Sequence, residues 1–217
     1  MAKTNAEGTQ HIVVKISSET DFVAKNDEFV AFANEIAEVA MTYLPENMDD
    51  LKGMKLESGV TIADALDEQV AKIGEKIDVI EYKSLEAPCI VAYNHAGNRI
   101  GVLVALNAGK NDAVVTAGKD TAMQIAAMNP VALHEDEVPT DTINRELEIS
   151  RDLIRAEGKP EEMVEKIALG KLKKFYKDNT LLNQDFVKDP SKSVGKMIQD
   201  TQAGLEVTAF RRVALGA

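Results

Sequence analysis

IVVKISSETDFVAKNDEFVAFANEIAEVAM, residues 12–41, carries the first indication of the fold. The opening IVVKI is a short run rich in β-branched residues, which is typical of a strand. After a polar segment, four apolar residues recur at helical spacing: Phe29, Phe32, Ile36 and Val39. A strand followed by a helix is therefore predicted.

The same order returns in the second half of the chain. Residues 100–106 (IGVLVAL) form another apolar, β-rich run, and residues 110–130 follow with a helical pattern that begins, like the first, with KND. Residues 61–85 and 193–215 each read as a helix followed by a strand. The repeating unit is therefore strand, helix, helix, strand.

Such a unit buries its strand pair under helices on one face and predicts a small sandwich. We therefore expect an α+β fold of two related sheet-plus-helix subdomains, which pack together as halves. The N-terminal core subdomain covers residues 1–88, and the C-terminal core subdomain covers residues 89–217.

Residues 138–179 interrupt the second unit with two further helical patterns, separated by Gly158 and Pro160. Helices joined by so short a turn fold back on each other. Their apolar stripe is thin, so we predict an antiparallel helical hairpin, a coiled coil, that projects from the C-terminal subdomain. Its apolar seam is a candidate surface for self-association or partner contact.

Charge and composition limit the function. The chain of 217 residues has a formal net charge of −11, which argues against direct nucleic-acid binding and against an anionic membrane surface. A protein partner is expected instead. No apolar run reaches the ~18 residues of a membrane span, and the first residues lack the apolar centre of a secretory signal, so we expect a cytoplasmic protein.

Enzymatic motifs find no support in the sequence. The lone Cys89 excludes an internal disulfide, and its apolar neighbours indicate a buried structural thiol. Three histidines are scattered, and neither zinc-site nor phosphate-loop spacings occur. Paired acids such as Glu161 and Glu162 are typical of a helix start. We expect no catalytic residue, no metal, no cofactor and no enzyme.

The polar segment SETDFVA contains one large ring, Phe22, directly after Asp21. On one interpretation Phe22 folds back with Val23 to cover the end of the core. On the other it is an exposed anchor that enters a pocket on a partner, with Asp21 directed at a polar group beside that pocket. Physical reasoning on these residues alone leaves both open.

SETDFVAKNDEF resembles the signature of the bacterial elongation factor Ts family, and further matches follow in the family's order. They are YNHAGNRIGVLVAL (93–106), AMQIAAMNPVAL (122–133), EGKPEEMVEKIALGKLKKFYKDNTLLNQDFVKD (157–189) and SKSVGKMI (191–198). The resemblance implies a guanine-nucleotide exchange factor that binds elongation factor Tu·GDP and promotes GDP release during translation elongation. The partner would be bound in its GDP-bound and nucleotide-free forms.

The resemblance also implies the site. Thr20, Asp21, Phe22 and Val23 correspond to a wedge that enters the nucleotide domain of the GTPase near its magnesium site. His95 corresponds to a partner contact of the second subdomain, although the spacing HAGNRIG differs from the family pattern around it. Members usually begin with a small helical domain, and the resemblance implies that this domain is missing here. The alternative function is a structural homodimer joined through the 138–179 hairpin.

Overall fold

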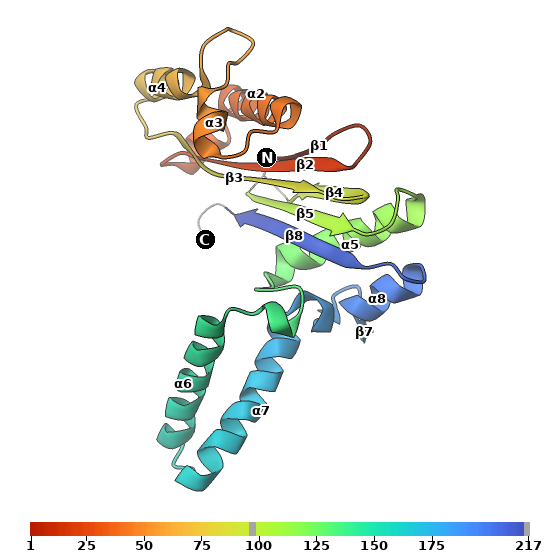
Figure 1. Ribbon diagram of the computed structural model, residues 1–217. Helices are drawn as coiled ribbons and strands as arrows, with labels where there is room; N and C mark the ends of the chain where they lie inside the picture. Colours follow the sequence, from red (N-terminus) through yellow and green to blue (C-terminus); the bar gives the residue numbers. More distant parts are fainter. Residues whose placement is uncertain (96–98, 215–217) are drawn as a thin grey trace. The chain divides into compact units, whose positions relative to one another are not determined.

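A computed structural model describes residues 1–95 and 99–214, apart from the side chain of Asp21. Two antiparallel three-stranded sheets lie within residues 1–126 and 205–217 (Figure 1). The first sheet has the order β1 (Ala2–Thr4), β2 (Gln10–Ser17), β3 (Asp78–Glu86). The second has the order β4 (Cys89–Asn94), β5 (Ile100–Leu106), β8 (Val207–Ala214). The strands predicted at 12–16 and 100–106 are confirmed, whereas β1 and β4 are additional.

Helices cover the outer face of each sheet (Figure 1). Those that follow β2 are α1 (Asp21–Ala24), α2 (Asp27–Tyr43), α3 (Met48–Gly53) and α4 (Ile62–Ile73), and α5 (Asp112–Met128) follows β5. The four apolar residues that predict α2 are all buried, and they pack with Ile12, Val14 and Ile16 of β2 in one cluster. Helical spacing in the sequence therefore marks the face that covers the sheet.

The two sheets face each other through a second apolar cluster. It contains Val13 of β2 together with Ile90, Leu103, Ala105 and Val213 of the second sheet. Val13 and its neighbours Ile12 and Val14 are each 0% exposed, so β2 is buried on both faces. Burial on both faces explains why three apolar residues, Ile12, Val13 and Val14, follow one another without alternation.

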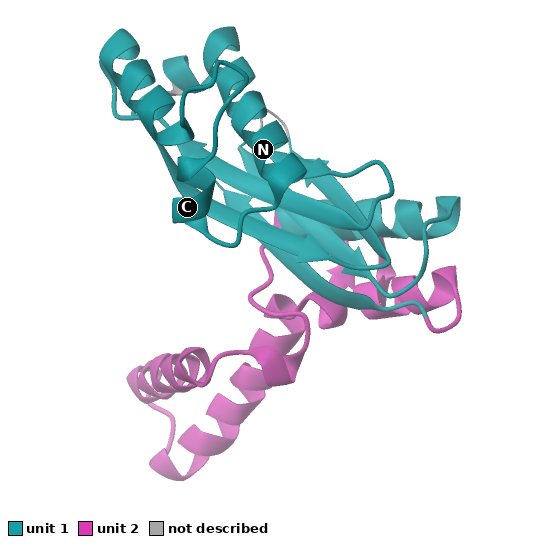
Figure 2. Ribbon diagram, turned by 45° about the horizontal axis from the view of Figure 1, so that its top comes forward, with its two compact units in different colours: residues 1–126, 205–217 teal, residues 127–204 magenta. Residues whose placement is uncertain are grey.

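The chain divides into two compact units (Figure 2): residues 1–126 with 205–217, and residues 127–204. The predicted boundary between residues 88 and 89 falls between β3 and β4. This boundary therefore separates the two three-stranded sheets, which pack together within the first unit. The boundary between the two compact units lies elsewhere, at residues 126/127 and 204/205.

The second unit contains the residues predicted to form a helical hairpin. Its elements are η2 (Glu135–Glu137), α6 (Thr140–Ala156), α7 (Glu161–Asn179), η3 (Leu181–Asn183), β6 (Asp185–Phe186), β7 (Asp189–Ser193) and α8 (Val194–Thr201). Helices α6 and α7 pair through buried Ile154, Val164 and Ala168. Arg151 donates two hydrogen bonds of 2.9 Å to Glu165 across the pair.

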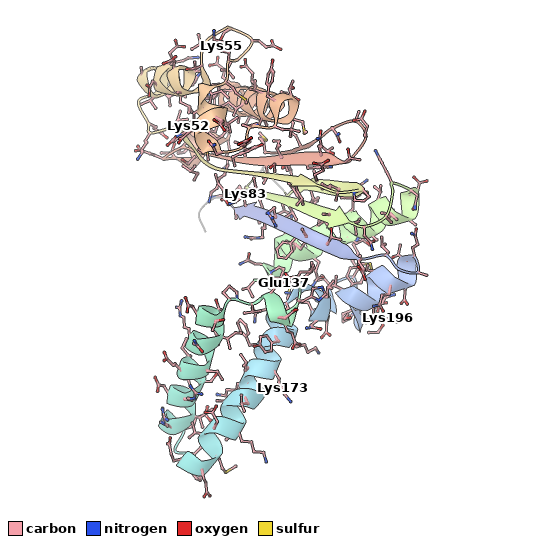
Figure 3. The ribbon with its side chains drawn as sticks, in the orientation of Figure 1. Lys52, Lys55, Lys83, Glu137, Lys173 and Lys196 are labelled. Atoms are coloured by element: carbon pink, nitrogen blue, oxygen red, sulfur yellow. The ribbon has the colours of Figure 1, made fainter. Side chains whose placement is uncertain are left out.

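Figure 3 places Glu137 just before α6 and Lys173 along α7. The carboxylate of Glu137 accepts a hydrogen bond of 3.3 Å from the backbone N–H of Leu133, which holds the chain at the start of the hairpin. Among the helices of the described residues, none has both the length and the apolar character of a membrane span.

His11 is a polar exception inside the first sheet. It is 0% exposed, and its Nε2 contacts the hydroxyl of Thr4, its cross-strand partner on β1. Burial lowers the pKa of His11 from 6.5 to about 4, and the nearby charge of Lys110 acts in the same direction. The ring is therefore neutral at pH 7, and no charge is buried between the strands.

Candidate functional site

Within the polar segment SETDFVA, residues Asp21–Ala24 form a single helical turn, α1, between β2 and α2. Thr20 precedes the turn, and its hydroxyl oxygen accepts a hydrogen bond of 3.5 Å from the N–H of Val23. The carbonyl of Thr20 accepts a second bond of 3.3 Å from the N–H of Ala24. Thr20 therefore acts as the N-cap of α1, a role that threonine performs well.

The two larger apolar side chains of this turn, Phe22 and Val23, have different environments. Val23 is partly buried and packs against the cluster of apolar residues between α2 and the first sheet. Phe22 is 89% exposed, the largest exposed fraction among the large hydrophobic side chains of the described residues. Phe22 is therefore exposed, as the second interpretation expects. Of the two residues, only Val23 covers the core.

The downstream end of the turn is held by the start of α2. The side chain of Asn26 accepts hydrogen bonds from the N–H groups of Glu28, at 2.8 Å, and Phe29, at 3.2 Å. Its own N–H donates to the carbonyl of Val23 at 3.0 Å. An asparagine three residues before the first apolar residue of a helix is a recognisable N-cap signal, so the sequence contained the information for this anchor.

The upstream end is held from a distant part of the chain. One oxygen of Glu75 accepts the backbone N–H of Thr20 at 2.9 Å, and the other accepts its hydroxyl at 2.7 Å. Glu75 lies between α4 and β3, 55 residues along the chain. Sequence reasoning missed this residue, and no local pattern indicates it.

His95 follows directly after the last residue of β4 and is exposed. Its Nδ1 lies 2.9 Å from the hydroxyl of Tyr93, and the two ring centroids are 5.9 Å apart. The hydroxyl of Tyr93 therefore holds the imidazole through this contact. The residues that follow, 96–98, with which the sequence departs from the expected spacing, lie outside the described part of the chain.

The chemistry available at α1 is that of an apolar anchor on a supported turn. Within the described residues, no three or more His, Cys, Asp or Glu side chains gather as a metal site. Cys89 is buried in β4, and burial raises the pKa of its thiol. The prediction of a buried structural cysteine is therefore confirmed.

Comparison with known proteins gives a consistent result. The family described as Elongation factor TS matches residues 19–217. The elongation factor Ts of Christiangramia forsetii is 45% identical over 217 residues, which are 100% of this chain and 77% of that protein. The elongation factor Ts of Flavobacterium psychrophilum is 46% identical over 216 residues, again 77% of its length. That of Legionella pneumophila strain Philadelphia 1 is 39% identical over 216 residues, 72% of its length.

Proposed function

The chain belongs to the elongation factor Ts family, and from that membership we propose that the α1 turn is the contact through which it opens the nucleotide site of its partner. The protein is a guanine-nucleotide exchange factor that binds elongation factor Tu·GDP and promotes GDP release during translation elongation. The observation that supports the role of α1 is Phe22, an aromatic ring left 89% exposed on a turn held at both ends.

An exposed phenylalanine is a strong binding group because its burial in a partner removes apolar surface from water. Val23 fixes the turn to the body of the protein, because its side chain packs on the core cluster. Thr20, Asp21, Phe22 and Val23 thus form the proposed wedge, in which Phe22 supplies the apolar contact. Asp21 supplies the charge beside the partner's magnesium site, as the family resemblance implies.

The mechanism follows from linkage between two binding events. The GTPase holds GDP through backbone amides around the phosphates and through Mg²⁺. A protein that binds the nucleotide-free form more tightly than the GDP-bound form weakens GDP binding by the same factor, because the coupling is reciprocal. No covalent bond forms or breaks on this chain, so it works as a binding protein without a catalytic residue or a cofactor.

Release of a fluorescent GDP analogue from elongation factor Tu tests this function. We expect the protein to accelerate the release in a saturable manner as its concentration rises. Release of the analogue into excess unlabelled GDP, with none of this protein added, measures the basal rate. An unchanged release rate at every concentration would show that the chain is no exchange factor for this GTPase.

Three finer assignments accompany the proposal. His95, whose Nδ1 lies 2.9 Å from the hydroxyl of Tyr93, is a second partner contact, directly after β4. Residues 1–88 and 89–217 are the two related subdomains of the core, each with its own three-stranded sheet. The protein acts in the cytoplasm, where translation takes place, and contacts neither nucleic acid nor membrane directly.

The hairpin α6–α7 is the proposed site of self-association. Apolar side chains remain exposed on both helices: Ile149 43%, Leu153 53%, Met163 44% and Leu169 47%. We propose that they let this coiled coil pair with a second copy. Sedimentation equilibrium is expected to show a dimer at high concentration, and Leu153→Lys is expected to weaken it. A wild-type chain that stays monomeric at the highest concentrations would remove the basis for this contact.

A further inference from the structure

The cap of α1 is completed by a residue from outside the turn. In a capping box, the side chain at the third helical position reaches back to the N–H of the N-cap residue. In α1 that position is Val23, which packs on the core and has no acceptor. Glu75 accepts the N–H of Thr20 instead, at 2.9 Å.

Glu75 also binds the hydroxyl of Thr20, at 2.7 Å. With its hydrogen donated to Glu75, that hydroxyl presents its lone pairs to the N–H of Val23. The Glu75 carboxylate therefore has two effects: it accepts the backbone N–H of Thr20, and it orients the Thr20 hydroxyl toward the N–H of Val23. A single side chain from the α4–β3 connection holds both polar groups that begin the turn.

The connection that carries Glu75 is itself held on both sides. Gly74 ends α4 in the left-handed region, at φ 79°, and its N–H donates to the carbonyl of Val70 at 2.8 Å. At the start of β3, Lys52 pairs with Asp78 at 2.7 Å, with Lys52 labelled on α3 in Figure 3. Glu75 thus reaches Thr20 from a support with fixed ends.

We propose that Glu75 is a positioning residue for nucleotide exchange: it completes the cap of α1 and so holds Phe22 in the orientation that enters the partner. The inference rests on the proposed function of α1. It assigns Thr20 an internal role, because both its N–H and its hydroxyl are engaged within the chain. A turn of four residues is too short to hold its own geometry, and without the carboxylate only the packing of Val23 and the cap at Asn26 support it.

Stimulated release of GDP measures the effect of Glu75→Ala. We expect the exchange efficiency to fall about tenfold, because two charge-assisted hydrogen bonds are lost from the cap. Thr20→Val, which removes the hydroxyl that Glu75 binds, is expected to show a decrease in the same direction, and Thr20→Ser, which keeps the hydroxyl, a smaller decrease than Thr20→Val. A decrease in Thr20→Ser as large as that in Thr20→Val would contradict the assignment.

Lys72→Met is the matched control. Lys72 lies in the last turn of α4, three residues before Glu75. It pairs with Glu28 at 2.6 Å, and both side chains are exposed. This ion pair links α4 to the first turn of α2, and it does not involve Thr20. Exposed pairs contribute little, so we expect exchange within about twofold of wild type. A loss as large as that of Glu75→Ala would assign the effect to general support from α4.

Dependence on Phe22 distinguishes positioning from a structural role. In the Phe22→Ala background, Glu75→Ala is expected to change the release rate by less than about twofold, because the group that it positions is gone. Amide hydrogen exchange over residues 20–25 is expected to be faster in Glu75→Ala than in wild type. An equal loss in both backgrounds would overturn the proposal.

The outcomes separate the inference from the proposed function. If wild type accelerates release and Glu75→Ala matches it, the function stands and the positioning role is wrong. If wild type itself fails to accelerate release, the proposed function is wrong, and the inference that rests on it falls as well.

Discussion

Phe22→Ala is expected to slow the stimulated release of GDP from elongation factor Tu by about thirtyfold. Truncation of a central aromatic anchor costs about 2 kcal/mol of binding energy, and each 1.4 kcal/mol corresponds to a factor of ten. Because this energy favours the nucleotide-free partner, its loss appears as slower release at a given concentration of the exchange factor.

Stability should hardly change in this variant. The ring is 89% exposed and contributes little to the core, so the free energy of unfolding is expected to stay within about 0.5 kcal/mol of wild type. Tyr43→Ala provides the control, since Tyr43 is another exposed aromatic ring, 65% accessible, at the far end of α2. It should exchange GDP like wild type. Wild-type rates in Phe22→Ala would show that α1 is not the wedge.

Gly118→Ala is expected to destabilise the protein by about 2 kcal/mol. A Cβ at this position of α5 would lie 2.5 Å from Cγ2 of Val91 and 3.0 Å from Cδ1 of Leu106. Both neighbours belong to the second sheet and are buried, so they cannot move aside without a shift of the helix. This penalty exceeds the gain of about 1 kcal/mol in helix propensity.

Gly170→Ala makes the same chemical change with the opposite expected sign. Gly170 lies within α7, and a Cβ there would meet no heavy atom within 4 Å. Only the propensity gain remains, so we expect stabilisation by up to about 1 kcal/mol. Urea unfolding followed by circular dichroism measures both variants. A higher unfolding midpoint for Gly118→Ala would mean that α5 does not pack this closely on the sheet.

Much of the fold was predictable because its signals lie between near neighbours in the chain. The helical spacing of Phe29, Phe32 and Ile36 places α2 correctly, and the apolar run IGVLVAL coincides with β5. The strand β1, which no sequence pattern predicts, is of another kind. β1 has three residues, and it is held at the edge by Asn94, whose side chain bonds both the N–H and the C=O of Ala2. No local pattern predicts a strand that depends on such a partner.

The candidate site shows the same difference. The sequence by itself determined that an aromatic residue stands in a polar segment between a strand and a helix, with Asn26 ready to cap that helix, because spacing and capping act over a few residues. Only the tertiary structure decided that Val23 points inward while Phe22 points to solvent, and that Glu75 completes the cap of α1. The inward packing of Val23 needs the assembled core, and the cap joins two residues 55 apart in the chain. Both form only once β3 has paired with β2 and the helices have packed on the first sheet.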